Sequence, residues 1–211
     1  MSALDLRLYL VTDAAMCAAR GLAETVEAAV AGGVTVVQLR DPDASGRDLY
    51  ETARQLIAIL RRSGVPLIVN DRVDVALAAE ADGVHVGQRD LPVEAVRRLV
   101  GPDFIVGLSV SNAHELQAAN ALPAASVDYL GVGPVFATPT KPDAAAPVGL
   151  DGLAELVTGA VLRTVAIGGV NEHNAAAVRA AGVDGLGVVS AICAAADPQA
   201  AAARLASVSV A

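Results

Sequence analysis

The sequence predicts an α/β protein, a single TIM-type (β/α)8 barrel that spans residues 1–211. Short apolar runs alternate with alanine-rich stretches of helical length along the whole chain, and no linker interrupts them. The runs contain few polar residues, which is typical of parallel strands that are covered on both faces. A doubly wound sheet would share this alternation. However, residues 12–15, the first turn from strand to helix, contain no GxGxxG motif, so the barrel is favoured.

Eight apolar runs are the predicted strands, and each is followed by a predicted helix. The strands are Leu6–Thr12, Val34–Leu39, Leu67–Val69, Gly83–Val86, Ile105–Leu108, Tyr129–Val132, Arg163–Ile167 and Gly185–Val188. The helices are Leu22–Ala31, Ser45–Arg62, Val73–Glu80, Val93–Val100, Ala113–Ala121, Leu150–Gly159, Glu172–Ala181 and Pro198–Ser207. The first helix stops at Gly32-Gly33, and the second begins at Ser45, a residue type preferred at helix N-caps.

A weak internal repeat supports this count of strands. Similar short segments begin at Ala31, Ala81, Ser126 and Ala181, and each precedes an even-numbered predicted strand. The interval between them corresponds to two strand–helix units. The repeat therefore divides the predicted barrel into quarters.

The amino-acid composition limits the classes of molecule that the protein is expected to bind. The chain is 54% hydrophobic but only 2% aromatic, so we expect a core of Ala, Val, Leu and Ile. A net charge of −8 without any basic run argues against nucleic acid, which needs a basic face. No charge-free stretch is long enough to span a bilayer, and Cys17 and Cys193 form no metal-binding pattern. We therefore expect a cytoplasmic protein with two free thiols that binds neither nucleic acid nor membrane. The sequence leaves open whether it forms a homo-oligomer.

Unusual polar and glycine residues gather at the carboxyl ends of the predicted strands, where barrel enzymes place their active sites. In chain order they are Gln38, Arg40, Asn70, Asp71, His85, Asp90, Ser109, Thr138, Thr140, Lys141, Gly168, Val189 and Ser190. Each has a simpler reading on its own. Asn70-Asp71 and Asp90 can cap helices, Arg40 can be a buried ion-pair partner, and His85 can be a core histidine. Their coincidence at one end of the barrel favours a functional site.

These residues suggest two anion-binding sites. Gly168 and the turn at Val189-Ser190 predict a phosphate cradle of the kind formed after the last two strands of a barrel, where a short helix presents free N–H groups. Asp71 and Asp90 follow adjacent strands and suit Mg²⁺, which usually takes one or two carboxylates and completes its shell with phosphate oxygens and water. Arg40 and Lys141 can neutralise the remaining phosphate oxygens. The pattern predicts stabilisation of a departing pyrophosphate.

At this point the chain resembles the thiamine phosphate synthase family from about residue 6 to 207. The motifs that carry the resemblance are Tyr9-Leu10-Val11-Thr12-Asp13, Val37-Gln38-Leu39-Arg40, Ile68-Val69-Asn70-Asp71-Arg72, Ala81-Asp82-Gly83-Val84-His85-Val86-Gly87-Gln88, Gly131-Val132-Gly133-Pro134-Val135-Phe136, Thr138-Pro139-Thr140-Lys141 and Ala166-Ile167-Gly168-Gly169. The ordered set is specific, although each motif alone is weak. The resemblance implies that a pyrimidine diphosphate, 4-amino-2-methyl-5-hydroxymethylpyrimidine diphosphate, is condensed with thiazole phosphate in thiamine biosynthesis. The products are thiamine phosphate and pyrophosphate, plus CO2 when the thiazole is carboxylated.

The resemblance also implies residue roles. Gln38, Asn70 and His85 would hold the pyrimidine diphosphate, together with the segment Leu39, Arg40, Asp41 and Pro42. Arg40, Ser109 and Lys141 would act catalytically on its phosphates. Thr138, Pro139, Thr140, Gly168, Val189 and Ser190 would hold the thiazole phosphate. Asp71 and Asp90 would bind Mg²⁺.

One position departs from the family pattern. The family usually has lysine two residues after the arginine of Gln-x-Arg, where this chain has Pro42. A phosphate-binding cation is thus missing, and Arg47 is the nearest candidate to replace it. Two rival functions follow: a thiazole tautomerase, which shares the barrel without the coupling, and a degenerate copy that binds thiamine phosphate as a regulator. The metal carboxylates and the Thr-x-Thr-Lys segment argue against the tautomerase, and tight product binding without turnover, unchanged by Pro42→Lys, would favour the regulator.

Overall fold

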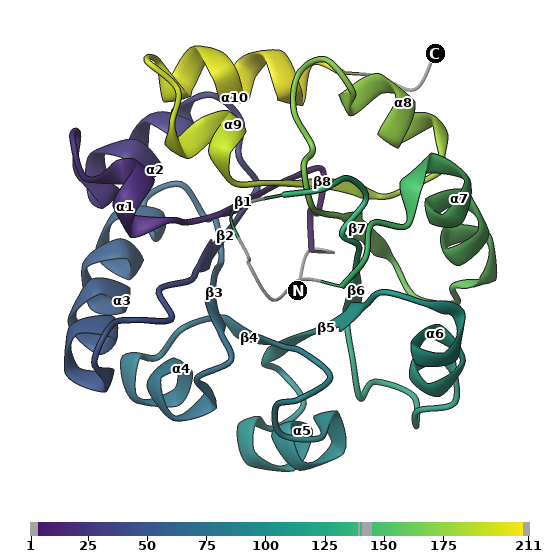
Figure 1. Ribbon diagram of the computed structural model, residues 1–211. Coiled ribbons are helices and arrows are strands. Elements are labelled where there is room, and N and C mark those ends of the chain that lie inside the picture. The colour runs from purple at the N-terminus through teal and green to yellow at the C-terminus, as the bar shows by residue number, and fades with distance from the viewer. Residues whose placement is uncertain (1–3, 139, 141–144, 209–211) are drawn as a thin grey trace.

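The computed structural model describes residues 4–138, 140 and 145–208. It confirms the predicted barrel: eight parallel strands close in the order β1 to β8, and β8 pairs with β1 through Leu8 opposite Leu186. The strands are β1 (Leu8–Val11), β2 (Val36–Leu39), β3 (Leu67–Asn70), β4 (Gly83–Val86), β5 (Ile105–Val110), β6 (Tyr129–Val132), β7 (Thr164–Ala166) and β8 (Gly185–Val188). Figure 1 shows the ring of strands from one end, with the helices outside it.

The outer layer contains the eight predicted helices and two short ones. In chain order they are α1 (Ala14–Cys17), α2 (Leu22–Ala31), α3 (Gly46–Leu60), α4 (Val73–Ala79), α5 (Val93–Val100), α6 (Ala113–Asn120), α7 (Gly149–Gly159), α8 (Ala175–Ala180), α9 (Ser190–Cys193) and α10 (Pro198–Ala206). Ser45 caps α3 as predicted, because its side chain accepts a hydrogen bond from Asp48 N. The one-turn helix α1 was not predicted; Asp13 caps it by accepting from Met16 N.

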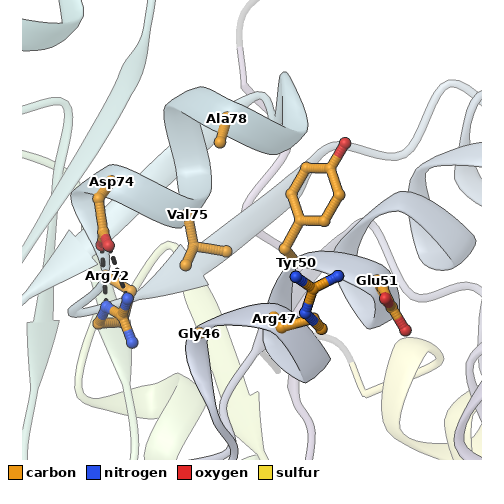
Figure 2. Close-up of a pocket in the computed structure, with 8 residues that line it drawn as sticks. All are labelled: Gly46, Arg47, Tyr50, Glu51, Arg72, Asp74, Val75 and Ala78. Carbon is orange, nitrogen blue, oxygen red and sulfur yellow. Dashed lines mark hydrogen bonds and ion pairs between the residues drawn. The ribbon is translucent and has the colours of Figure 1, made fainter.

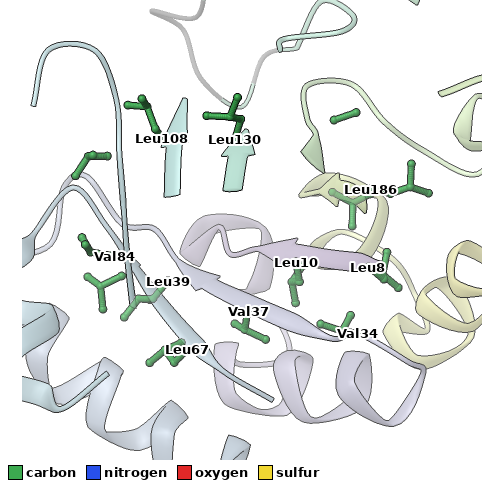
Figure 3. Close-up of a cluster of buried hydrophobic side chains, with 14 of the residues drawn as sticks. Leu8, Leu10, Val34, Val37, Leu39, Leu67, Val84, Leu108, Leu130 and Leu186 are labelled. Carbon is green, nitrogen blue, oxygen red and sulfur yellow. The ribbon is translucent and has the colours of Figure 1, made fainter. Parts of the chain in front are cut away.

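Two separate cores follow from the alternation of side chains along each strand. Outward-facing leucines and valines pack between strands and helices, among them Leu10, Val37 and Leu130 (Figure 3). Inward-facing residues form a smaller cluster inside the barrel that includes Tyr9 and Tyr129. Because both faces are covered, the strands read as nearly continuous apolar runs in the sequence.

The amino ends of the strands form what we call the floor of the barrel, and here the internal repeat has a structural cause. Asp82, Asp128 and Asp184 each stand just before an even-numbered strand, and each carboxylate accepts a backbone N–H from the preceding odd-numbered strand, at 2.7–2.8 Å. In the first quarter Thr35 takes this role, accepting from Leu8 N at 3.1 Å. The repeat therefore ties each pair of strands together at the floor.

Two further expectations concern compartment. Cys17 and Cys193 are both buried and both free, as the sequence predicts. Within the described ranges, no helix combines the length and the apolar character needed to cross a membrane.

Candidate active site

The carboxyl ends of the strands form the mouth of the barrel, and β2 brings the first predicted residues there. Gln38 is buried inside the barrel, with its Nε2 donating to Tyr9 Oη at 2.9 Å. Arg40 follows the strand and is half-buried. Its backbone N donates to Thr12 Oγ1 at 3.0 Å, so the end of β1 fixes the start of the β2–α3 loop. In the described part of the chain the Arg40 guanidinium has no hydrogen-bond partner, which leaves it available to an anion.

The neighbours of Arg40 are placed differently from one another. Leu39 is 1% exposed and packs in the outer core, because side chains alternate along a strand and Gln38 points inward. Its side chain is therefore not at the mouth, and only its backbone can contribute to a substrate site. Asp41 is half-buried and Pro42 is exposed in the β2–α3 loop.

Arg47, the nearest candidate for the missing cation, lies on the outer flank. It lines a hollow of about 380 Å³ between α3 and α4 together with Tyr50 and Glu51. In Figure 2 its side chain lies on the α3 side of this hollow, beside Tyr50, whereas Arg72 pairs with Asp74 on the α4 side. Arg47 therefore belongs to a flank between two helices and not to the barrel interior.

Asp71 follows β3 in an unusual backbone conformation. Its φ is +60°, in the left-handed region that only a small fraction of non-glycine residues occupy. Its backbone N donates to His85 O at 2.8 Å, which ties it to β4. The N-cap position of α4 is held by Arg72, so neither Asn70 nor Asp71 occupies it. A strained polar residue at a strand end, outside the cap position, is typical of a functional site.

Asp90 lies in the loop after β4, the strand that pairs with β3. Its Oδ2 accepts a hydrogen bond from Gly87 N at 2.7 Å, which holds the carboxylate against the end of the strand. Helix α5 takes Pro92 as its N-cap, so capping does not explain Asp90 either. No cluster of three or more metal-ligand side chains occurs in the described residues. Two carboxylates on adjacent strand ends nevertheless fit Mg²⁺, which draws its remaining ligands from substrate phosphates and water.

His85 and Ser109 meet inside the mouth. His85 Nε2 lies 2.9 Å from Ser109 Oγ, and His85 Nδ1 lies 3.0 Å from Tyr129 Oη. Gln88 Nε2 donates to the Ser109 carbonyl at 2.7 Å and fixes the end of β5. Since Asp71 N donates to the His85 carbonyl, hydrogen bonds connect the acidic residue after β3 to the hydroxyl on β5.

The other side of the mouth carries the predicted thiazole residues. Thr138 and Thr140 lie with their hydroxyl oxygens 3.1 Å apart. Pro139 and Lys141 lie outside the described residues. The β6–α7 loop packs on the turn after β7, where Phe136 N donates to Gly168 O at 3.0 Å. Gly168 has φ +96°, and a Cβ there would lie 2.5 Å from Pro134 Cβ, so this turn requires glycine whatever ligand it binds.

The turn after β8 has the predicted form. Val189 is the N-cap of the short helix α9, which begins at the exposed Ser190. The first N–H groups of a helix have no intrahelical acceptor and are free to bind an anion. A short helix thus begins at the place where the phosphate cradle is predicted, next to β1 in the closed barrel, and phosphate binding there stays a prediction.

Comparison with known proteins identifies the group to which this chain belongs. Residues 8–192 match the family described as thiamine monophosphate synthase. The chain belongs to the thiamine monophosphate synthase family. Among curated members, the thiamine-phosphate synthase of Azorhizobium caulinodans is 57% identical over 92% of this chain and 90% of its own length. That of Chloroflexus aurantiacus is 55% identical over 95% of this chain and 91% of its own length. The chain thus stands among thiamine-phosphate synthases, which are transferases.

Solved structures agree with this family. The thiamine phosphate pyrophosphorylase of Pyrococcus furiosus superposes with a TM-score of 0.85 at 37% identity, covering 96% of this chain and 95% of its own. A 3-hexulose-6-phosphate synthase superposes with a TM-score of 0.68 at 19% identity, which supports the fold alone. The family expected from the motifs is therefore confirmed.

Four residues near the mouth had no predicted role in the site, namely Tyr9, Thr12, Gln88 and Tyr129. Each of them holds a predicted family residue in place: Gln38, Arg40, Ser109 and His85, respectively. Tyr9, Thr12 and Gln88 lie in family motifs, which was the available signal. Tyr129 looks like an ordinary core residue in an apolar run, and only the closed barrel brings its hydroxyl to that of Tyr9.

Proposed function

We propose that the mouth of this barrel holds the pyrimidine diphosphate and the thiazole phosphate side by side and couples them into thiamine phosphate. The observation that carries the proposal is the connected set Asp71, His85 and Ser109, bonded in sequence across three adjacent strands. This set supports the proposal because it joins the backbone of an acidic residue to a hydroxyl-bearing residue at the end of the barrel where we expect a diphosphate clamp. Arg40 lies two strand positions beyond Gln38 on the same mouth, with its cationic group available.

The residues suit a reaction in which the leaving group departs first. The bond between the pyrimidine methylene carbon and the bridging oxygen breaks, and its electron pair stays on the pyrophosphate. The thiazole ring nitrogen then gives its lone pair to the pyrimidine methyl cation and forms the new C–N bond; a carboxylated thiazole also loses CO2. This sequence needs a clamp for charge and a fixed acceptor, and it needs no strong base.

On the pyrimidine side, Gln38 and Asn70 hold the heterocycle, while Arg40, Ser109 and Lys141 bind its phosphate oxygens. Asp71 and Asp90 would hold Mg²⁺, which neutralises charge that develops on the pyrophosphate. Leu39, Asp41 and Pro42 line the same side through the backbone of the β2–α3 loop. Two features of the described residues support this division: they offer the Arg40 guanidinium no hydrogen-bond partner, and His85 hydrogen-bonds to Ser109.

On the thiazole side, Thr138, Pro139 and Thr140 contact the thiazole phosphate, and the backbone at Gly168, Val189 and Ser190 holds its phosphate group. The free N–H groups at the start of α9 supply donors without adding charge. With both molecules bound, the thiazole nitrogen lies beside the pyrimidine methylene carbon to which it bonds. The partners we propose are thus these two small phosphorylated heterocycles, in the cytoplasm.

The test is a coupling assay on the whole chain with both heterocycles, in parallel with and without Mg²⁺, and with the thiazole in carboxylated and simple form. We expect thiamine phosphate and pyrophosphate in equal amounts, and loss of turnover when EDTA removes the metal. Thiamine phosphate that binds tightly without any turnover would instead identify a regulator. Isomerisation of the thiazole without coupling would identify a tautomerase.

A further inference from the structure

A chain of hydrogen bonds crosses the barrel just below the mouth. Gln38 Nε2 donates to Tyr9 Oη at 2.9 Å, and Tyr9 Oη lies 2.6 Å from Tyr129 Oη. Tyr129 Oη lies 3.0 Å from His85 Nδ1, and His85 Nε2 lies 2.9 Å from Ser109 Oγ. An amide on β2 is thus linked to a hydroxyl on β5 through three side chains buried inside the barrel.

The strand register and a glycine make this chain possible. His85 pairs with Gly107, and Gly107 pairs with Tyr129, so the three residues form one row across β4, β5 and β6. A Cβ on Gly107 would lie 2.4 Å from His85 Nδ1 and 2.3 Å from Tyr129 Cζ, too close for any other residue. The two rings meet over this glycine with their centroids 5.5 Å apart. The contact is therefore a built feature of the barrel interior.

The direction of the hydrogen bonds follows from the number of hydrogens available. Burial raises the pKa of Tyr9 and of Tyr129, so each phenol keeps its single hydrogen. The Gln38 amide nitrogen is a donor only, which leaves Tyr9 free to give its own hydrogen to Tyr129. Tyr129 then gives its hydrogen to His85 Nδ1.

This direction fixes the state of His85. A ring that accepts at Nδ1 and is neutral carries its hydrogen on Nε2, and it donates that hydrogen to Ser109 Oγ. Among the described residues Ser109 Oγ contacts no acceptor besides the His85 ring, so its own hydrogen is available to a bound ligand. We propose that Tyr129, supported by Tyr9, is a positioning residue that holds His85 in its Nε2–H tautomer and so makes Ser109 a hydrogen-bond donor to the leaving diphosphate. This inference rests on the proposed function.

The opposite direction requires a different arrangement at the far end. A ring with a hydrogen on Nδ1 would donate to Tyr129, Tyr129 to Tyr9, and Tyr9 would then need an acceptor. Only a reversed Gln38 amide, with its oxygen toward Tyr9, could provide one. The row of hydrogen bonds therefore links the Gln38 amide, which we expect to hold the pyrimidine, to the Ser109 hydroxyl, which we expect to hold its diphosphate.

The first test compares three single substitutions of tyrosine by phenylalanine in the coupling assay. Tyr129→Phe removes the hydrogen that His85 Nδ1 accepts, and we expect kcat to fall about ten- to hundredfold while KM for the pyrimidine diphosphate changes much less. Tyr9→Phe leaves the bond to His85 in place and should lower kcat about two- to fivefold. Tyr50→Phe, on the exposed outer flank, removes an equivalent hydroxyl and should leave kcat unchanged.

The second test needs no variant. Long-range ¹H–¹⁵N NMR spectra distinguish protonated from unprotonated ring nitrogens, and the chain has only three histidines, so His85→Gln assigns the signal. With Mg²⁺ and pyrophosphate as the probe, we expect wild-type His85 to be protonated on Nε2 and not on Nδ1. In Tyr129→Phe a signal from the Nδ1–H form should appear.

Two results would overturn the inference: a wild-type His85 with its hydrogen on Nδ1, or a folded Tyr129→Phe variant with wild-type kcat and an unchanged tautomer. If Tyr129→Phe fails to fold, the wild-type NMR spectrum and the kcat of Tyr9→Phe still test the inference. Failure of the proposed function gives a different pattern, because wild type would then form no thiamine phosphate whatever the tautomer of His85.

Discussion

The floor and the mouth of this barrel are built on opposite principles. At the floor one device is repeated around the ring: a side-chain oxygen just before each even-numbered strand accepts a backbone N–H of the preceding strand, from Thr35, Asp82, Asp128 or Asp184. At the mouth the described strand ends present a mixture of groups, among them the Arg40 guanidinium, the carboxylates of Asp71 and Asp90 and the Ser109 hydroxyl. Repetition at the floor serves closure of the barrel, whereas variety at the mouth serves chemistry. Substitutions at the two ends should therefore separate stability from activity.

The largest effect is expected for the acidic pair at the mouth. Asp71→Asn and Asp90→Asn should each lower Mg²⁺-dependent kcat about a hundredfold or more, roughly 2.7 kcal/mol, because the metal clamp loses a charged ligand. Asparagine tolerates the positive φ of Asp71, so the fold should be kept. Asp103→Asn, in the exposed α5–β5 connection, is the matched control. Full activity in either mouth variant would show that the metal assignment is wrong.

The next effect is a gain of activity at the mouth. Pro42→Lys restores the cation of the family pattern in an exposed loop, and we expect kcat/KM to rise about tenfold because one charge-assisted phosphate contact is regained. Pro42→Gln removes the proline ring without adding charge and should give no such gain. Equal kcat/KM values for the lysine and glutamine variants, measured at low and high salt, would show that position 42 does not contact the diphosphate.

At the floor, the expected loss is in stability alone. Asp128 accepts from Val106 N at 2.7 Å and from Arg97 Nη2 at 2.8 Å. Asp128→Ala should lower the free energy of unfolding by about 2 kcal/mol and Tm by about 4–8 °C, while kcat per folded molecule is unchanged. Thermal unfolding and the coupling assay on one preparation measure both, with Asp103→Ala as control. A large fall in kcat without a fall in Tm would contradict the division between floor and mouth.

The smallest effect concerns the neutral member of the repeat. Thr35 Oγ1 accepts from Leu8 N at 3.1 Å and donates to Leu8 O at 3.0 Å, with no charge involved. Thr35→Val should therefore lower the free energy of unfolding by only about 1 kcal/mol. Denaturant unfolding of Thr35→Val and of Asp128→Ala compares how much stability the β1–β2 pair and the β5–β6 pair gain from these hydrogen bonds. A Thr35→Val loss larger than that of Asp128→Ala would mean that the four positions are not equivalent.

The sequence was informative where patterns are periodic or local. Strand positions follow from apolar runs, and the mouth residues follow from polar groups at their ends, so the ring of elements was predicted almost completely. Helix α1 was missed because a single turn is too short to show a helical period. The sequence showed Asp82, Asp128 and Asp184 only as part of a weak internal repeat. Their role could not be predicted because their hydrogen bonds join segments that are distant in sequence.

The least predictable part of the site was the support beneath it. Tyr9 on β1 and Tyr129 on β6 lie 120 positions apart, and only the closed barrel brings their hydroxyls together across its interior, at 2.6 Å. Leu39 shows the opposite case: it was included because a family motif contains it, although strand alternation directs its side chain to the outer core. The roles of Pro139 and Lys141, which lie outside the described residues, stay predictions.

The most direct test of the mouth as a diphosphate clamp is a crystal structure of the whole chain with Mn²⁺ and pyrophosphate, in which anomalous scattering locates the metal. We predict a metal ion about 2.1 Å from carboxylate oxygens of both Asp71 and Asp90. The pyrophosphate should bridge that ion to Arg40 and Ser109. A metal bound elsewhere on the chain, or carboxylates that face different sides of the molecule with pyrophosphate present, would contradict this account.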